Sequence, residues 1–199
     1  AVYGAEDAQI TFKLDRLLEP KIDELDLRAV YEEIELPAME VLSDMELTGI
    51  QVDTQQLQAL SVELADRIEG LEDAIYREAG KTFTINSPKQ LQVILFEELG
   101  LTPIKKTKTG FSTDAETLKA LAEKHLLPKL ILQYRELAKL KSTYVDALPQ
   151  AVSEITGRIH TSFHQAVAAT GWLASNNPNL QNIPSRTEEG RRVRSCFVA

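Results

Sequence analysis

Cysteine and long apolar runs are scarce in this chain, and each scarcity excludes a class of protein. The single cysteine, Cys196, cannot form an internal disulfide, which is compatible with a reducing compartment. Apolar runs such as residues 126–132, interrupted by Pro128 and Lys129, are far shorter than the roughly 20 residues that a membrane span requires. The N-terminus has no basic region followed by an apolar one, so no secretory signal is recognisable. We therefore expect an intracellular soluble protein that does not associate with membranes.

Positive charge is scarce in the first half of the chain and common in the second. Residues 1–100 carry 8 Lys and Arg against 22 Asp and Glu, a net −14, whereas residues 101–199 carry 14 against 8, a net +6. A basic half within an acidic protein can offer phosphates a local positive field. Lysines that merely solvate helices would produce the same count, so charge alone leaves both interpretations open.

Hydrophobic spacing and helix-terminating residues predict a mainly α fold. One helix is expected to end near Glu19, because Pro20 follows it, and another covers residues 26–48 with a kink or break at Pro37. The clearest helix begins after Asp53 and ends at Gly80. Its apolar residues recur in steps of three or four: Leu57, Leu60, Leu64, Ile68, Leu71 and Ile75. We expect it to pack along a second long helix over residues 128–148, and the two would form a stalk.

Between these two helices the sequence predicts a small helical tip. Ser87 as N-cap, Pro88 and a following Gly100 delimit one short helix, and Thr113 with Glu116 predicts a capping box for another. After Pro149 the composition changes, and residues 158–167 alternate loosely in the manner of a strand. A second domain is therefore expected to begin there.

The tip carries three kinds of phosphate ligand. They are helix N-terminal amides with Asn86 and Ser87, the lysines Lys105, Lys106 and Lys108, and the hydroxyls of Ser112 and Thr113. Helix caps and lysine-rich loops also occur in helical proteins that bind no phosphate, so this pattern leaves both interpretations open.

The stretch YRELAKLKSTY, residues 134–144, places Arg135, Lys139 and Ser142 on one face of a helix. This basic face can follow a phosphate backbone. The alternative is an exposed helix face on which Arg135 pairs with a nearby acid.

Residues 170–194 are too polar to be core. Their amides, Asn176, Asn177, Asn179, Gln181 and Asn182, suit reading base edges or bracing a turn, and their arginines can grip phosphate or carboxylate. No closely paired acids follow this stretch to bind a metal or move a proton. His160 and His164 are four residues apart but lie in a strand-like region without a third ligand, so we interpret His164 as a hydrogen-bonding residue.

Three segments together resemble the family A DNA polymerases of the bacterial DNA polymerase I type. They are TGWLASNNPNLQNIP followed by EEGRRVR, then YRELAKLKSTYVDALP, and YGAED near the N-terminus. The resemblance covers essentially the whole chain. It implies that residues 1–20 are the C-terminal helix of a 3'-5' exonuclease domain, residues 21–149 a linking helix and thumb, and residues 150–199 the first β-strands of an α+β palm. The thumb would be a long antiparallel helix pair with a small helical tip.

The resemblance also implies roles for individual residues. Asp7 would be a metal ligand of the exonuclease, and Tyr3 would orient the attacking water in a two-metal hydrolysis. DNA contacts are implied for the tip residues named above and for a second group: Arg135, Lys139, Lys141, Ser142, Thr143, His164, Trp172, Asn179, Gln181, Asn182 and Arg186. Two positions depart from the family pattern, because Trp172 stands where the family has Arg and Asn177 where it has Asp.

By this resemblance the full-length protein would be a DNA-directed DNA polymerase of replication and repair. It would use Mg²⁺, bind primer-template DNA and deoxynucleotide triphosphates, act as a monomer and be cytoplasmic and nucleoid-associated. This segment would grip the duplex and be catalytically incomplete alone. The alternative is a helical DNA-binding or interaction module that has kept the scaffold without the chemistry.

Overall fold

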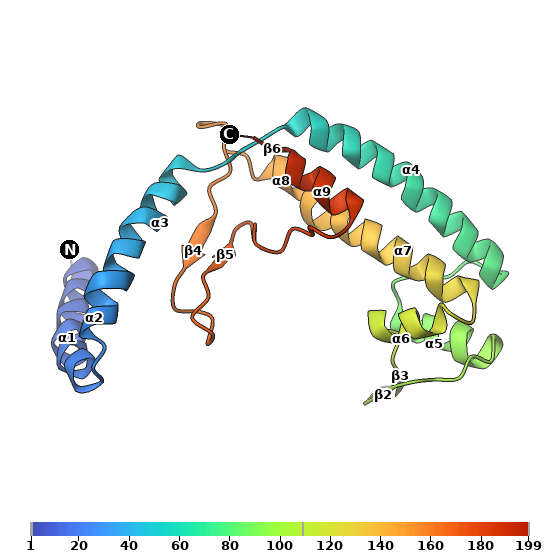
Figure 1. Ribbon diagram of the computed structural model, residues 1–199, viewed down its shortest axis with the longest axis horizontal. Helices are drawn as coiled ribbons and strands as arrows, with labels where there is room; N and C mark the ends of the chain where they lie inside the picture. The colour runs from blue at the N-terminus through green and yellow to red at the C-terminus, as the bar shows by residue number, and fades with distance from the viewer. Residues whose placement is uncertain (1, 109, 199) are drawn as a thin grey trace. The chain divides into compact units, whose positions relative to one another are not determined.

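Helices make up most of the molecule and confirm the mainly α fold class (Figure 1). The structure is a computed structural model that describes residues 2–108 and 110–198, with side chains from residue 4 onward. The chain forms two compact units. The first comprises residues 1–49 and 160–182, and the second comprises residues 50–159 and 183–199.

The first unit consists of a series of helices and a two-stranded hairpin. Its elements are α1 (Val2–Glu24), α2 (Arg28–Val30), the π-helical segment η1 (Tyr31–Glu35), α3 (Leu36–Thr48), β4 (Ser162–His164) and β5 (Ala174–Asn176). The two strands pair antiparallel, with Ser162 opposite Asn176 and His164 opposite Ala174. The loop between them, residues 165–173, is the turn of this hairpin.

Helix α1 continues through Pro20 to Glu24, so the prediction that it ends near Glu19 was wrong. Proline removes one backbone donor from a helix, and the carbonyl four residues earlier loses its partner. Arg16, at that position, lies on an exposed helix where water can hydrate the carbonyl, so the interruption is tolerated. Chain reversal after α1 falls instead at Asp26, which has a φ of 55°.

The residues around Pro37 form one continuous helical run, with a π-helical turn ahead of the proline. Segment η1 ends at Glu35, and the backbone N–H of Leu36 donates to the carbonyl of Tyr31 in the wider π pattern. This wider turn lies where a proline would otherwise clash with the preceding turn of an α-helix. The predicted stop at Gly49 is confirmed, because α3 ends at Thr48 and Gly49 has a φ of 65°.

The second unit contains the stalk and the tip. Its elements are β1 (Gln51–Val52), α4 (Thr54–Ala79), α5 (Pro88–Gln92), the π-helical segment η2 (Val93–Glu98), β2 (Lys106–Thr107), β3 (Gly110–Phe111), α6 (Ala115–Leu121), α7 (Leu126–Leu140), the π-helical segment η3 (Lys141–Val145), α8 (Ala147–Gln150), α9 (Glu188–Ser195) and β6 (Phe197–Val198). β1 pairs antiparallel with β6, and β2 with β3.

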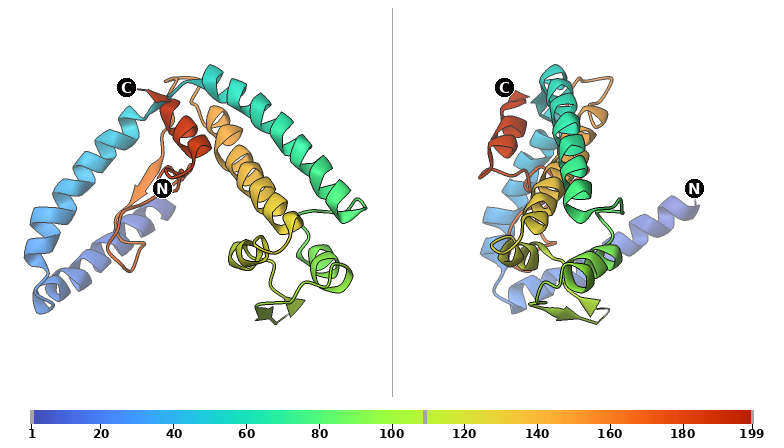
Figure 2. Two further views of the ribbon diagram at one scale, coloured as in Figure 1. Left: turned by 45° about the vertical axis from the view of Figure 1, so that its right-hand side comes forward. Right: turned by 90° about the vertical axis from the view of Figure 1, so that its right-hand side faces the viewer.

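The predicted stalk is confirmed as an antiparallel pair of α4 and α7, which lie side by side in all views (Figures 1 and 2). The side chain of Asp53 accepts hydrogen bonds from the backbone N–H groups of Gln55 and Gln56, and Gly80 ends the helix with a φ of 70°. The second stalk helix begins at Leu126, capped by His125, and changes to the π-helical η3 at Lys141. Helical structure continues through Val145, so the helix predicted over residues 128–148 is largely confirmed, with an earlier start and a π-helical segment near its end.

A hydrophobic core joins the tip to the far end of the stalk. Its fully buried members come from α4, α5, η2, α6 and α7 and include Ile75, Leu91, Leu95, Leu118 and Ile131. Ser87 caps α5 as predicted. The capping box at Thr113 was wrong: Asp114 is the N-cap of α6 and accepts a hydrogen bond from the N–H of Thr117. Aspartate caps a helix at least as well as threonine, and here the cap lies one residue later.

The strand expected over residues 158–167 is shorter than predicted. Ile159 forms isolated bridges with Ile50 and Val152, and regular pairing occurs only in β4. Strands this short leave many of their backbone groups free to bond outside the ladder. The carbonyl of Asn176, for example, accepts a hydrogen bond from the Thr161 hydroxyl.

Candidate nucleic-acid interface

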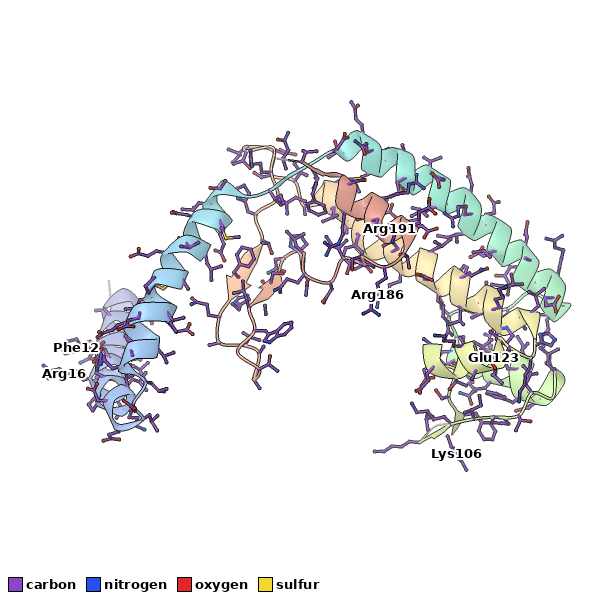
Figure 3. The ribbon with its side chains drawn as sticks, in the orientation of Figure 1. Phe12, Arg16, Lys106, Glu123, Arg186 and Arg191 are labelled. Carbon is purple, nitrogen blue, oxygen red and sulfur yellow. The ribbon has the colours of Figure 1, made fainter. Side chains whose placement is uncertain are left out.

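Two of the three tip lysines are exposed and have no acidic partner within 4 Å among the described residues. Lys106 lies on β2 and Lys108 in the turn that follows it, and Figure 3 shows Lys106 projecting outward from this hairpin. Lys105 differs, because its Nζ lies 3.1 Å from Oδ2 of Asp114 and 3.8 Å from Oε2 of Glu116. The hydrogen bond that Lys105 donates to Asp114 raises the pKa of the lysine, so the ammonium stays charged but is paired within the tip.

The predicted hydroxyl ligands of the tip are largely used inside the fold. Ser112 and Thr113 are buried, and the Ser112 hydroxyl accepts a hydrogen bond from the N–H of Asp114 at 3.2 Å. The Ser87 hydroxyl accepts one from the N–H of Gln90 at 3.4 Å. Asn86 is exposed beside this cap. The tip surface that can meet a phosphate therefore consists mainly of Lys106, Lys108 and the surroundings of Asn86.

Arg135 points inward from the predicted basic face of α7. Its Nη1 donates to the backbone carbonyl of Thr113 at 2.6 Å, which ties the stalk to the tip. Burial lowers the pKa of this guanidinium, as expected for a cation that is partly withdrawn from water. This contact is to a backbone carbonyl and not to the nearby acid that the sequence left open, and a contact between Arg135 and a DNA phosphate stays a prediction.

The rest of this face is exposed around the start of η3. Lys139, Ser142 and Thr143 are exposed, and the Ser142 hydroxyl donates to the carbonyl of Lys139 at 3.4 Å. Lys141 is instead committed to Asp146, with Nζ at 2.9 and 2.8 Å from its two carboxylate oxygens. The ammonium of Lys139 and the hydroxyl of Thr143 thus remain as donors for an outside ligand at the point where the helix widens, whereas the Ser142 hydroxyl keeps only its capacity to accept.

Several of the predicted base-reading amides brace the segment after β5. The Asn179 side-chain oxygen accepts the backbone N–H groups of Gln181 and Asn182 at 3.0 and 3.3 Å. Nε2 of Gln181 donates to the carbonyl of Leu173 at 2.7 Å. Of the two uses that the sequence left open, bracing a turn is the one these groups have here. All three residues remain exposed.

The structure constrains the residue type at position 177 but not at position 172. Trp172 is 78% exposed, so packing does not explain the indole. Asn177 has a φ of 55°, in the left-handed region that both Asn and Asp tolerate. The change from Asp at this position therefore keeps the backbone preference and removes only the charge.

The described residues contain no group of three or more His, Cys, Asp or Glu that could hold a metal ion. Nδ1 of His160 lies 2.7 Å from the carbonyl of Glu46, and Nε2 of His164 is buried without a hydrogen-bond partner. A hydrogen-bonding role for His164 thus finds no partner at this atom. Asp7 lies exposed on α1, and the side chain of Tyr3 lies outside the described residues.

The arginines of residues 186–194 divide into exposed and paired ones. Arg186 and Arg191 are exposed, and Nη1 of Arg191 donates to the carbonyl of Arg186 at 2.9 Å (Figure 3). Arg192 grips Glu63 on α4 through two hydrogen bonds of 2.6 Å each. Its hydrogen bonds lower the pKa of Glu63. Together with the 2.7 Å pair of Arg67 and Glu189, this fastens α9 to the stalk.

Sequence reasoning missed the acidic partners that occupy these cations. Asp114, Asp146 and Glu63 each pair with a predicted or neighbouring basic residue, and nothing in their spacing indicated it, because Glu63 and Arg192 are 129 residues apart. Asp114 alone had a local signal as an N-cap. Gly190 was also missed: a Cβ there would lie 2.5 Å from the carbonyl oxygen of Pro184, so only glycine fits the approach of α9 to that loop.

No helix in the described part of the chain is both long enough and apolar enough to cross a membrane. In the second unit, exposed cations and hydroxyls lie on the tip and at η3. In the first unit, exposed amides lie around the β4–β5 hairpin.

Known proteins resemble this chain along its whole length. It is 50% identical to the DNA polymerase I of Chloroflexus aurantiacus over 205 residues, covering 100% of this chain and 22% of that protein. It is also 50% identical to the DNA polymerase I of Pseudomonas aeruginosa, covering 99% of this chain and 22% of that protein. The chain thus spans about a fifth of the length of these relatives.

A solved structure of the POL domain of Pol1 from M. smegmatis, in complex with DNA primer-template and dNTP, matches with a TM-score of 0.89. The match has 45% sequence identity and covers 94% of this chain and 33% of that one. The family model for DNA polymerase family A matches residues 54–199. The chain therefore belongs to DNA polymerase family A.

Proposed function

We propose that this chain is the part of a DNA polymerase of the DNA polymerase I type that grips primer-template duplex. The observation that carries the proposal is its likeness, at 45% identity and a TM-score of 0.89, to a POL domain in complex with primer-template. In the full-length protein this segment would serve a DNA-directed DNA polymerase that binds deoxynucleotide triphosphates. Residues 1–20, 21–149 and 150–199 are proposed as the end of the exonuclease domain, the linking helix with the thumb, and the start of the palm.

The proposed grip uses side chains that the fold leaves exposed. Lys106 and Lys108 on the tip, and Lys139 beside η3, would neutralise backbone phosphates, with the Thr143 hydroxyl donating to a phosphate oxygen. Arg186 is a further exposed cation in the second unit. Neutralising phosphates releases counterions, so this binding would weaken steeply with salt.

Other residues implied by the resemblance would support the grip indirectly. Arg135 would hold the tip on the stalk through Thr113, and Lys141 would hold η3 through Asp146. Asn179 and Gln181 would fix the backbone beside Leu173, and their exposed edges would face the minor groove. These residues would be positioning residues whose loss alters the shape of the binding surface.

The metal chemistry of the family does not follow from the residues described here. Asp7 would be a single ligand on an exposed helix, and no group of three candidate ligands surrounds it among the described residues. Mg²⁺ is therefore proposed only for the full-length enzyme. The same holds for action as a monomer and for a cytoplasmic, nucleoid-associated location.

Fluorescence anisotropy with a labelled primer-template tests the proposed grip. We expect salt-dependent affinity, and we expect the double variant Lys106→Gln with Lys108→Gln to reduce the slope of log affinity against log salt by about 2. Lys124→Gln, a change at an exposed lysine outside the proposed surface, is the matched control and should leave the slope unchanged.

A chain without salt-dependent affinity for primer-template would contradict this function. Such a result would favour the second candidate, a helical interaction module that has kept the scaffold. Trp172 and Asn177 are the observations in its favour, since both remove a charge that the family pattern has at a DNA-facing position.

A further inference from the structure

The β4–β5 hairpin belongs to a stretch of the chain that carries no formal charge. Residues 159–185 contain no Asp, Glu, Lys or Arg, although 26% of the whole chain is charged. The hairpin itself thus offers no cation to phosphate, and the charged groups that bond to it are carboxylates: Glu46 accepts from the N–H of Phe163, and Glu35 accepts from Nε2 of Gln165. Any contact between this hairpin and DNA must therefore come from uncharged groups.

Trp172 lies in the loop of this hairpin with most of its ring in solvent. It is 78% exposed, and Val167 in the same loop is 72% exposed. Aromatic rings of this size usually bury most of their surface in a folded protein. An exposed indole on a neutral loop is the kind of group that stacks on a flat, uncharged partner.

The backbone on both sides of Trp172 is held in place. The N–H of Gly171 donates to the carbonyl of Ala168 at 2.9 Å, and the carbonyl of Leu173 accepts from Nε2 of Gln181 at 2.7 Å. At the start of the loop, Nε2 of Gln165 donates to the Glu35 carboxylate at 2.8 Å. The loop therefore presents the ring from a braced backbone, which lowers the conformational entropy that binding would cost.

We propose that Trp172 is a stacking site for an unpaired nucleobase of single-stranded DNA. The faces of paired bases inside a duplex are covered by their neighbours, whereas an unpaired base offers a free face to an aromatic ring. Asn176, in the same uncharged stretch, is an exposed amide that can hydrogen-bond to a base edge. The ligand class is thus a frayed, mismatched or single-stranded end.

This inference rests on the proposed function, because it requires that the chain binds DNA. It adds the separate claim that one site binds an unpaired base. Binding to duplex phosphates is salt-dependent and needs the lysines of the second unit. Stacking at Trp172 is uncharged and needs an unpaired base. The two claims can therefore fail independently.

Intrinsic fluorescence reads this site alone, because Trp172 is the only tryptophan of the chain. We expect a short oligothymidylate to quench its emission and to reduce quenching by acrylamide, since stacking covers the ring. A primer-template with an unpaired 3' end should quench more than the same duplex with a fully paired end. Equal quenching by the two ends, or none by either, would overturn the proposal.

Variants of Trp172 separate stacking from other uses of the loop. Trp172→Ala should weaken oligothymidylate binding, measured by anisotropy, about tenfold at both low and high salt, because the uncharged ring that stacks on a base is removed. Trp172→Phe keeps an aromatic face and should stay within about threefold of the parent. Circular dichroism of each variant checks that the fold is retained.

Three outcomes contradict the inference while leaving the proposed function intact. One is unchanged oligothymidylate affinity in Trp172→Ala while primer-template still binds in a salt-dependent way. Another is a loss that appears only at low salt, which would indicate an ionic contact. The third is a change in sedimentation on removing Trp172 without any change in DNA affinity, which would assign the ring to a protein contact.

Discussion

The two compact units differ most in what they bury. Every buried apolar side chain among the described residues lies in the second unit, from Val52 to Ile159 and from Ile183 to Cys196. In the first unit, α1 and α3 leave their large apolar residues in solvent, for example Leu17 at 58%, Val41 at 59% and Met45 at 50% exposed. The same helical spacing of apolar residues thus builds a core in one unit and an uncovered surface in the other.

The charged residues do not follow this division, because both units use them in contacts between distant parts of the sequence. In the second unit, ion pairs and hydrogen bonds join elements far apart in sequence, such as Arg192 with Glu63 and Arg135 with the carbonyl of Thr113. In the first unit Arg28 bonds to Glu19, Asp23 and Glu32, all within nine residues of it, whereas the carboxylates of Glu35 and Glu46 accept from Gln165 and Phe163, 130 and 117 residues away. An amphipathic pattern therefore identifies a helix but does not tell whether its apolar face is covered.

Removing a buried leucine should have the largest effect. Leu64→Ala in α4, where Leu64 is fully buried, should lower the free energy of unfolding by about 3 kcal/mol through lost burial and the cavity left behind. The matched change Leu17→Ala in α1 should cost less than about 0.5 kcal/mol. Urea unfolding followed by circular dichroism measures both. Equal losses would mean that the apolar face of α1 is covered in solution.

Removing a partly buried guanidinium should have an intermediate effect. Arg135→Met keeps much of the packing but leaves the carbonyl of Thr113 without its 2.6 Å donor, which should cost about 1–2 kcal/mol. Arg28→Met in the first unit removes three solvent-exposed ion pairs, and we expect no resolvable change in thermal unfolding. A larger loss at Arg28 than at Arg135 would reverse the comparison.

The smallest effect is expected from removing the carboxylate of Asp146, whose contribution to stability should depend on pH. Burial raises the pKa of Asp146, but hydrogen bonds from Lys141 and Ser61 outweigh it, so the pKa is lowered. A lowered pKa stabilises the folded state above the carboxyl's ordinary value near 4, and this stabilisation disappears as the pH falls through the folded-state pKa. Since Asp146 is partly exposed, we expect less than about 1 kcal/mol.

The variant Asp146→Asn should therefore be less stable than the parent at pH 7, and the two should converge at acidic pH. Thermal unfolding across a pH series measures the difference. Asp23→Asn in the first unit is the control: Arg28 lowers the pKa of Asp23 too, but Asp23 is exposed, and the change should be smaller. A difference for Asp146→Asn that grows on acidification would contradict this account.

Local signals predicted most of the helices and misplaced a few of their ends. Asp53, Gly80, Ser87 and Gly49 acted as expected, because caps and stops depend on neighbouring residues alone. Pro20 did not end its helix, since an exposed carbonyl can be hydrated by water. The π-helical turn at η3 was not predictable, because nothing in residues 141–145 marks it in sequence.

The DNA contacts of the candidate site stay a prediction, and the structure shows only which of its side chains already have partners within the protein. The sequence named Arg135, Lys141, Lys105 and Ser112 as ligands for DNA, and the structure uses each of them inside the second unit. Lys106, Lys108, Lys139, Ser142 and Thr143 remain exposed, and their contact with DNA stays a prediction.

The sequence by itself determined the helices, the uneven charge, the family motifs and the presence of a tryptophan in a neutral stretch, because these are properties of residue order and type. Tertiary structure alone decided which polar side chains are engaged in hydrogen bonds or ion pairs within the protein. A guanidinium or an ammonium binds whatever acceptor the fold brings within about 3 Å, and acceptors 22 or 129 residues away, as for Arg135 and Arg192, leave no local trace.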